Sequence, residues 1–117
     1  MSEIPNITRQ LRSLVKSSGE LELSIRHSEV ATLKENEVLL KVEASPINPS
    51  DLGLLLAYAN VSKAEFSGTK SNPVVTAPIN PKLMDALAPR IDKSMSAGNE
   101  GAGLVIAAGD SDEAQAL

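Results

Sequence analysis

Two stretches of the chain alternate between apolar and polar residues, with Leu39 as the one exception. Over residues 20–26 and again over 37–44, every second side chain is apolar. A period of two places alternate side chains on opposite faces of a strand. We therefore predict two antiparallel strands, each with one buried face and one face in water. Their apolar positions are Leu21, Leu23 and Ile25 in the first strand and Val38, Leu40, Val42 and Ala44 in the second.

A more weakly patterned segment precedes these strands. Residues 9–16 predict a short strand, and Ser17-Ser18-Gly19-Glu20 predicts the turn after it. Near the end of the chain, the apolar run from Gly101 to Ala108 predicts a buried strand. Residues 111–117 predict the start of a helix, with Asp110 or Ser111 as its N-cap.

Apolar residues recur at helical spacing in two further stretches. The first predicts a short helix over about 50–59, with Pro49 in its first turn, where the missing N–H does no harm. The second, through Leu83, Met84, Leu87 and Ile91, predicts a helix from about 82 to 91. Between them, residues 60–80 are rich in Ser, Thr, Asn, Pro and Gly, and predict an irregular surface excursion.

Composition narrows the class of protein. At 117 residues the chain has room for one domain and one modest core. Eleven basic and fifteen acidic side chains give a net charge of −4 without a basic stripe, which argues against nucleic acid and anionic membranes as partners. The absence of cysteine excludes disulfides and thiolate metal sites. With no apolar leader or membrane-length segment, we expect a cytoplasmic protein.

Two polar segments about fifty residues apart are the candidates for chemistry. The first, Asn48-Pro49-Ser50-Asp51, follows the strand at 37–44, and by itself predicts a capped helix start with Asn48 or Ser50 as N-cap. The second, Gly98-Asn99-Glu100-Gly101-Ala102-Gly103, opens the last apolar run. Its glycines predict tight backbone packing or a bend. They do not form the G-x-G-x-x-G pattern of a dinucleotide-binding loop.

Together these segments resemble the N-terminal, GroES-like domain of the medium-chain dehydrogenase/reductase superfamily, in its zinc-free quinone-oxidoreductase and enoyl-reductase branch. The resemblance covers roughly residues 8–56 and 95–110. It implies a mainly β fold with short helices, in the form of a partly open barrel. In zinc-dependent relatives the positions of Asn48 and Asn99 hold a cysteine and a histidine ligand, so the resemblance implies no metal here.

The resemblance also implies a set of site residues. Asn48, Ser50 and Tyr58 would be catalytic, and Asn48, Asp51 and Asn99 would contact the cofactor. An amide at Asn48 could bond a substrate carbonyl or the nicotinamide ribose. Tyr58 lies near the place of a proton-delivering tyrosine in enoyl-thioester reductases. The alternative, which we favour for Tyr58, is an aromatic ring packed at a helix end with its hydroxyl in water.

The implied function is that of half an enzyme. The chain would be the substrate-side domain of an oxidoreductase that reduces quinones or activated C=C bonds such as enones, truncated before the Rossmann domain that holds NADPH. It would be inactive alone. Residues 60–94 would form an insertion near the active-site mouth. Open strand edges predict self-association, and we expect a homo-oligomer. The alternative is a stand-alone GroES-like binding module without catalysis.

Overall fold

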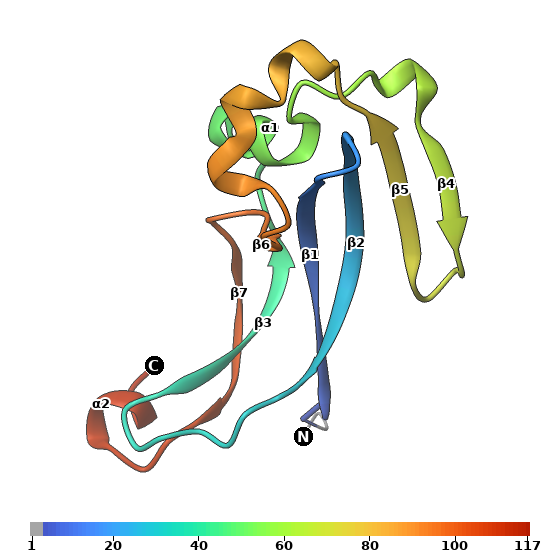
Figure 1. Cartoon of the computed structure of the whole chain (residues 1–117). Coiled ribbons are helices and arrows are strands. Elements are labelled where there is room, and N and C mark those ends of the chain that lie inside the picture. The colour runs from blue at the N-terminus through green and yellow to red at the C-terminus, as the bar shows by residue number, and fades with distance from the viewer. Residues whose placement is uncertain (1–3) are drawn as a thin grey trace. The chain divides into compact units, whose positions relative to one another are not determined.

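The computed structural model describes residues 4–117, which are mainly β with short helices (Figure 1). The strands are β1 (Ile7–Lys16), β2 (Glu20–Glu29), β3 (Val38–Ala44), β4 (Glu65–Gly68), β5 (Pro73–Pro78), β6 (Met95–Ser96) and β7 (Ala102–Ala108). The helices are α1 (Pro49–Leu56), α2 (Asp112–Gln115) and the short 3₁₀ helices η1 (Val61–Lys63), η2 (Pro81–Leu83) and η3 (Asp85–Arg90). Across residues 4–117 the strands form two open sheets, one ordered β4-β5-β2-β1-β6 and one formed by β3 and β7.

The chain divides into two compact units. The first, here called the β3–β7 unit, comprises Ser28–Pro46, Glu100–Leu117 and the segment that ends at Thr8. The second, the five-stranded unit, comprises Arg9–His27 and Ile47–Asn99. Each unit is described by itself below.

The predicted strands at 9–16, 20–26 and 37–44 are confirmed as β1, β2 and β3. The predicted turn between the first two is also confirmed. Gly19 has φ +89°, and its N–H donates to the carbonyl of Lys16 at 2.9 Å. Glycine adopts this left-handed conformation without the steric penalty that a Cβ would bring.

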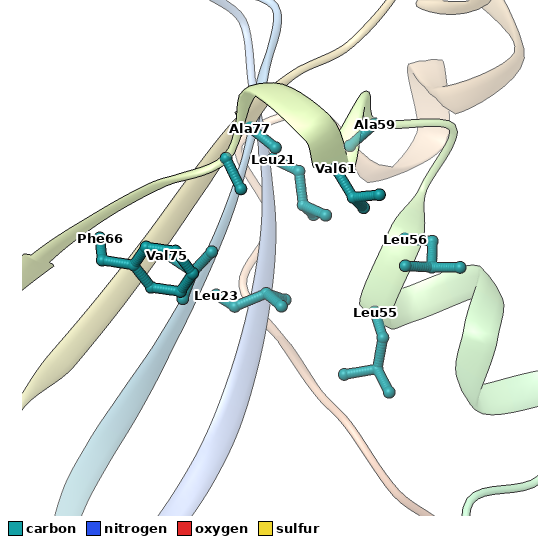
Figure 2. A pocket seen from close by; sticks show the side chains of 10 residues that line it. Leu21, Leu23, Leu55, Leu56, Ala59, Val61, Phe66, Val75 and Ala77 are labelled. Carbon is teal, nitrogen blue, oxygen red and sulfur yellow. The ribbon is translucent and has the colours of Figure 1, made fainter.

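The prediction of an irregular surface excursion over 60–80 is wrong. This segment forms the β4–β5 hairpin, and β5 pairs with β2 so that Leu21 lies opposite Ala77 and Leu23 lies opposite Val75. Figure 2 shows Leu23, Val75 and Phe66 side by side on neighbouring strands. Polar and turn-forming residues dominate the composition of this segment, and they obscure the alternate positions that the pairing buries.

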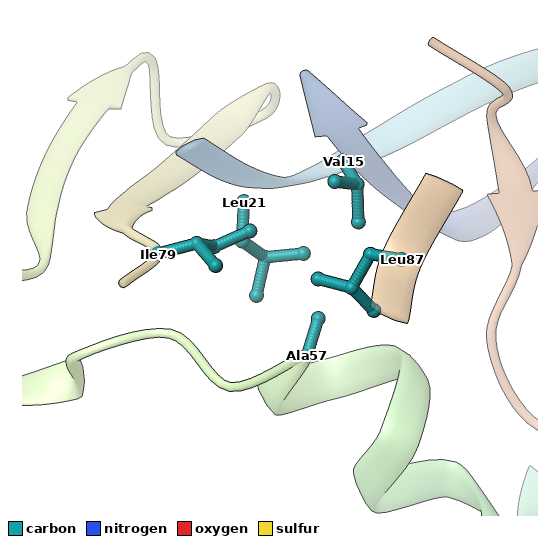
Figure 3. Packing of buried hydrophobic residues seen from close by; sticks show 5 residues of the cluster. All are labelled: Val15, Leu21, Ala57, Ile79 and Leu87. Atoms are coloured by element: carbon teal, nitrogen blue, oxygen red, sulfur yellow. The ribbon is translucent and has the colours of Figure 1, made fainter. Parts of the chain in front are cut away.

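The core of the five-stranded unit gathers side chains from separate elements. Val15 of β1, Leu21 of β2 and Leu87 of η3 are buried against one another, with Ile79 after β5 and Ala57 after α1 (Figure 3). The core is aliphatic and small, as expected for a chain with so few aromatic residues. Leu21 contributes to it because its strand position alternates inward, as the period of two predicts.

The predicted helix over 82–91 is present only as 3₁₀ turns. η2 and η3 follow one another, and Pro89 lies inside η3. Proline cannot donate the backbone hydrogen bond of an α-helix and its ring crowds the preceding turn, so a continuous α-helix is disfavoured here. The predicted apolar face is nevertheless partly correct, because Leu87 is buried while Met84 and Ile91 pack against the core.

Helix α1 is shorter than predicted and is held at both ends. It ends at Leu56 because the next two residues are left-handed, Ala57 with φ +44° and Tyr58 with φ +60°. Its last turn is bonded by side chains from other elements, since Arg90 Nη1 donates to the Gly53 carbonyl at 2.9 Å. The buried Ser13 hydroxyl donates to the Leu54 carbonyl at 2.5 Å and accepts from Arg90 Nη2 at 3.2 Å.

The β3–β7 unit departs from the predicted burial. Both strands were expected to bury an apolar face, yet Val42 is 59% exposed and Leu104 is 58% exposed. Leu40 and Val105 are exposed as well. Among the described residues this sheet has two strands, and too few neighbours cover it to bury the alternating side chains. The expected cap of the last helix is confirmed, because the Ser111 hydroxyl accepts from the Ala114 N–H at 3.1 Å.

An ion pair joins the facing ends of β1 and β2. Lys16 Nζ lies 2.5 Å from a carboxylate oxygen of Glu22. The hydrogen bond to Glu22 raises the pKa of Lys16 above its usual 10.5, with a further contribution from the charges of Glu22 and Glu20 and an opposing one from desolvation.

This ion pair predicts a loss of stability in alkali. The pKa of Lys16 is higher in the folded state than in the unfolded state. The ion pair therefore contributes fully to the free energy of unfolding below pH 10.5, and this contribution disappears as the pH rises through the folded-state pKa. The pair is partly exposed, so we expect a change of no more than about 1 kcal/mol in the free energy of unfolding. Urea titrations on both sides of this window should show the change in the wild type. Glu22→Gln should show a smaller one, and an equal pH dependence in the two proteins would refute the assignment.

None of the helices within residues 4–117 is both long and apolar enough to cross a membrane.

Candidate functional site

The structure brings the two polar segments together. Asn48 Nδ2 donates to Asn99 Oδ1 at 3.0 Å, although the residues are 51 positions apart in the sequence. Both belong to the five-stranded unit. Within the β3–β7 unit, the adjoining residues are also bonded, since the Ser45 hydroxyl donates to the Glu100 carbonyl at 2.7 Å. The sequence spacing alone could not show this pairing, and we call Asn48 and Asn99 the amide pair.

Asn48 is fixed in place by the start of α1. It is the N-cap residue, with Pro49 at the first helical position. Asp51 completes a capping box, because its carboxylate accepts the Asn48 backbone N–H at 2.7 Å. Asp51 is only 5% exposed, and a carboxylate in the first turn is also favoured by the helix dipole. Asp51, predicted as a cofactor contact, is therefore buried in the structure, where its carboxylate holds the backbone of Asn48.

The other two predicted residues lie at opposite ends of α1. Ser50 is exposed in the first turn, two positions from Asn48. Tyr58 is 61% exposed and follows the helix. The eight residues of α1 span about 12 Å, with Asn48 directly before the helix and Tyr58 two residues after its end. The structure thus brings Asn48, Asn99 and Ser50 to one end of α1 and leaves Tyr58 at the other.

The chemistry of the amide pair is that of neutral hydrogen bonding. Because Asn99 Oδ1 accepts from Asn48, the Nδ2 group of the exposed Asn99 is oriented as a donor. Such a donor, with a nearby serine hydroxyl, suits a carbonyl or sugar hydroxyl. It does not suit a pyrophosphate, which requires cationic side chains or several backbone N–H groups. These residues can therefore donate to a carbonyl or a hydroxyl group and offer no charge to a phosphate.

The described part of the chain contains no group of three or more His, Cys, Asp or Glu side chains arranged to hold a metal ion.

Sequence reasoning missed an apolar pocket elsewhere in the five-stranded unit. Its volume is about 240 Å³, and every side chain that lines it is apolar (Figure 2). It lies against the C-terminal half of α1, through Leu55 and Leu56, and none of the predicted site residues lines it. The sequence carries no local signal for this pocket, because its lining residues come from three strands and a helix end that are far apart in the chain.

Comparison of the chain with protein-family models found no match, and comparison with curated proteins found none either.

Proposed function

We propose that this chain is the substrate-side domain of a zinc-free, NADPH-dependent oxidoreductase that reduces quinones or activated C=C bonds such as enones. Its fold would be the GroES-like, partly open barrel of the medium-chain dehydrogenase/reductase superfamily. The observation that carries the proposal is the 3.0 Å bond between Asn48 and Asn99. These are the two positions at which zinc-dependent relatives of that superfamily have metal ligands, and here two amides meet instead.

In this proposal the amide pair binds and orients the neutral polar part of its ligands. Asn99 donates to a substrate carbonyl or a ribose hydroxyl, and Asn48 fixes the direction of that donor. Ser50 supplies a second hydrogen-bonding group, and Asp51 positions Asn48 through the capping box. NADPH, when bound, supplies the hydride, and the remainder of that cofactor is held outside this chain. A homo-oligomer is part of the same proposal.

The test begins with the native polypeptide purified from its source. Its mass, detected with an antibody raised against this chain, should exceed 12.3 kDa by a coenzyme-binding domain. It should oxidise NADPH in the presence of quinones or enones. Absence of such turnover with both substrate classes would end the proposal.

Replacing Asn99 by alanine should then weaken catalysis. Loss of one hydrogen bond to a carbonyl corresponds to about tenfold in kcat/KM. The matched control is Asn36→Ala, an exposed asparagine in the turn before β3, which should leave kcat/KM unchanged. Equal values for the two variants would show that the amide pair does not contact substrate or cofactor.

A stand-alone binding module is the second candidate. The observation that favours it is the wholly apolar pocket, which lies apart from the amide pair. A native polypeptide of 12.3 kDa, with no NADPH-dependent turnover, would support this candidate over the first.

A further inference from the structure

The apolar pocket has a floor built by strand pairing. Leu21 lies opposite Ala77 and Leu23 lies opposite Val75 in the β2–β5 ladder. Residues that face each other across an antiparallel pair project to the same side of the sheet. Phe66 continues this row on β4, where it pairs with Val75. The sheet therefore presents a continuous apolar surface of three strands.

The pocket's walls come from α1 and from the segment that follows it. Leu55 and Leu56 line the pocket from the end of α1 (Figure 2). Val61 and Ala64 close a third side next to η1. The rim is open to solvent, with Phe66 81% exposed. Water in this space would contact almost only hydrocarbon, which is unfavourable.

Backbone hydrogen bonds attach one wall of the pocket to the sheet. The Asn60 N–H donates to the Pro78 carbonyl at 2.8 Å, and Ala59 forms an isolated bridge with Ile79. These bonds tie the segment after α1 to the end of β5. The pocket is therefore present in the structure without a ligand, with one of its walls attached to the end of β5.

We propose that this pocket is a binding site for a small neutral hydrocarbon group, an aryl ring or a short branched alkyl chain. A cavity of 150 Å³ lined by aliphatic and aromatic side chains accommodates benzene, so the 240 Å³ here suffices for roughly eight to ten carbon atoms. An anion is excluded because no lining side chain can donate to it. This inference does not depend on the proposed oxidoreductase function, since the pocket and the amide pair lie at different ends of α1.

The test uses p-xylene as the probe and the chain labelled with ¹³C at its Leu and Val methyl groups. Titration should give saturable NMR shifts at Leu23, Leu55 and Val75, with half-saturation below about 1 mM. The matched anion, 4-methylbenzoate, should bind at least about tenfold more weakly. Equal binding of the two molecules would overturn the assignment of a neutral ligand.

Two variants locate the site. Ala64→Leu fills the pocket from its wall and should reduce p-xylene affinity at least about tenfold. Val61→Lys places a charge at the rim and should also weaken binding, without requiring any change in the core. The control Leu52→Lys alters an exposed apolar residue of α1 that does not line the pocket, and should leave affinity unchanged.

Three results would overturn the proposal. The first is the absence of saturable shifts up to the solubility limit of p-xylene. The second is a set of shifts as large at Val42 and Leu104 of the exposed β3–β7 sheet as at the pocket, which would indicate unspecific adsorption. The third is dimerisation that shifts the NMR signals of the pocket methyl groups as the protein concentration rises, in the absence of p-xylene. This result would show that a second copy of the chain occupies the pocket.

Discussion

Replacement of Gly103 by alanine is expected to disrupt the pairing of β3 with β7. Gly103 lies opposite Val42 in this ladder, next to a register shift. A Cβ at this position would overlap the carbonyl oxygen of Lys41 and would lie within 3.0 Å of Lys41 C and Val42 Cα. These are backbone atoms that cannot turn aside, so the strands must separate. We expect a loss of at least about 3 kcal/mol in the free energy of unfolding.

The matched control is Gly101→Ala, two residues earlier in the same segment. There the new Cβ would lie 3.3 Å from Val42 Cγ1, the end of an exposed side chain that can rotate away. We expect this variant to change stability by less than about 1 kcal/mol. Urea denaturation gives the two free energies, and amide hydrogen exchange in β3 and β7 locates the effect. Similar values for the two variants would contradict the close backbone approach at Gly103.

Leu87→Ala is expected to destabilise the five-stranded unit by about 2–5 kcal/mol. Leu87 is one of the few large side chains that are buried, and it packs against core residues from several elements. Truncation to alanine leaves a cavity, because these elements cannot all move inward to fill it. Because the core is small, this loss is a large part of the expected stability of such a domain.

Leu83→Ala provides the comparison for Leu87→Ala. The two leucines lie four residues apart and belong to the same predicted helical face, but Leu83 is exposed. Its truncation should cost less than about 1 kcal/mol. The difference between the midpoints of thermal or urea unfolding measures the effect of burial directly. An equal loss of stability in the two variants would contradict the burial of Leu87 and the exposure of Leu83.

Local sequence patterns were informative where local physics decides the structure. The alternation over 20–26 identified β2 and its inward-facing Leu21. Ser111 was one of the two predicted caps of the last helix, because N-caps depend on a few neighbouring atoms. The same alternation over 37–44 identified β3 but not its exposure. Burial depends on what covers a sheet, and periodicity describes only which side chains share a face.

Longer-range features could not be obtained in this way. Pairing of β5 with β2 joins residues at least fifty positions apart, and the polar composition of 60–80 concealed it. The candidate site also combines a local feature with a long-range one. Asn48 was one of two N-caps predicted from the order of residues, whereas the capping role of Asp51 and the contact between Asn48 and Asn99 appear only in the structure. The pocket beside Leu55 depends on three strands and a helix end, and had no local signature.

The contacts of Arg90 join three elements of the five-stranded unit without a carboxylate. Its guanidinium connects η3 to α1 and β1 through the Gly53 carbonyl and the hydroxyl of Ser13, while its Nε is buried without a partner. A carbonyl and a hydroxyl are neutral acceptors whose position is set by the backbone of α1 and by β1. The direction of the Arg90 side chain is therefore fixed by the shape of this junction and not by an opposite charge.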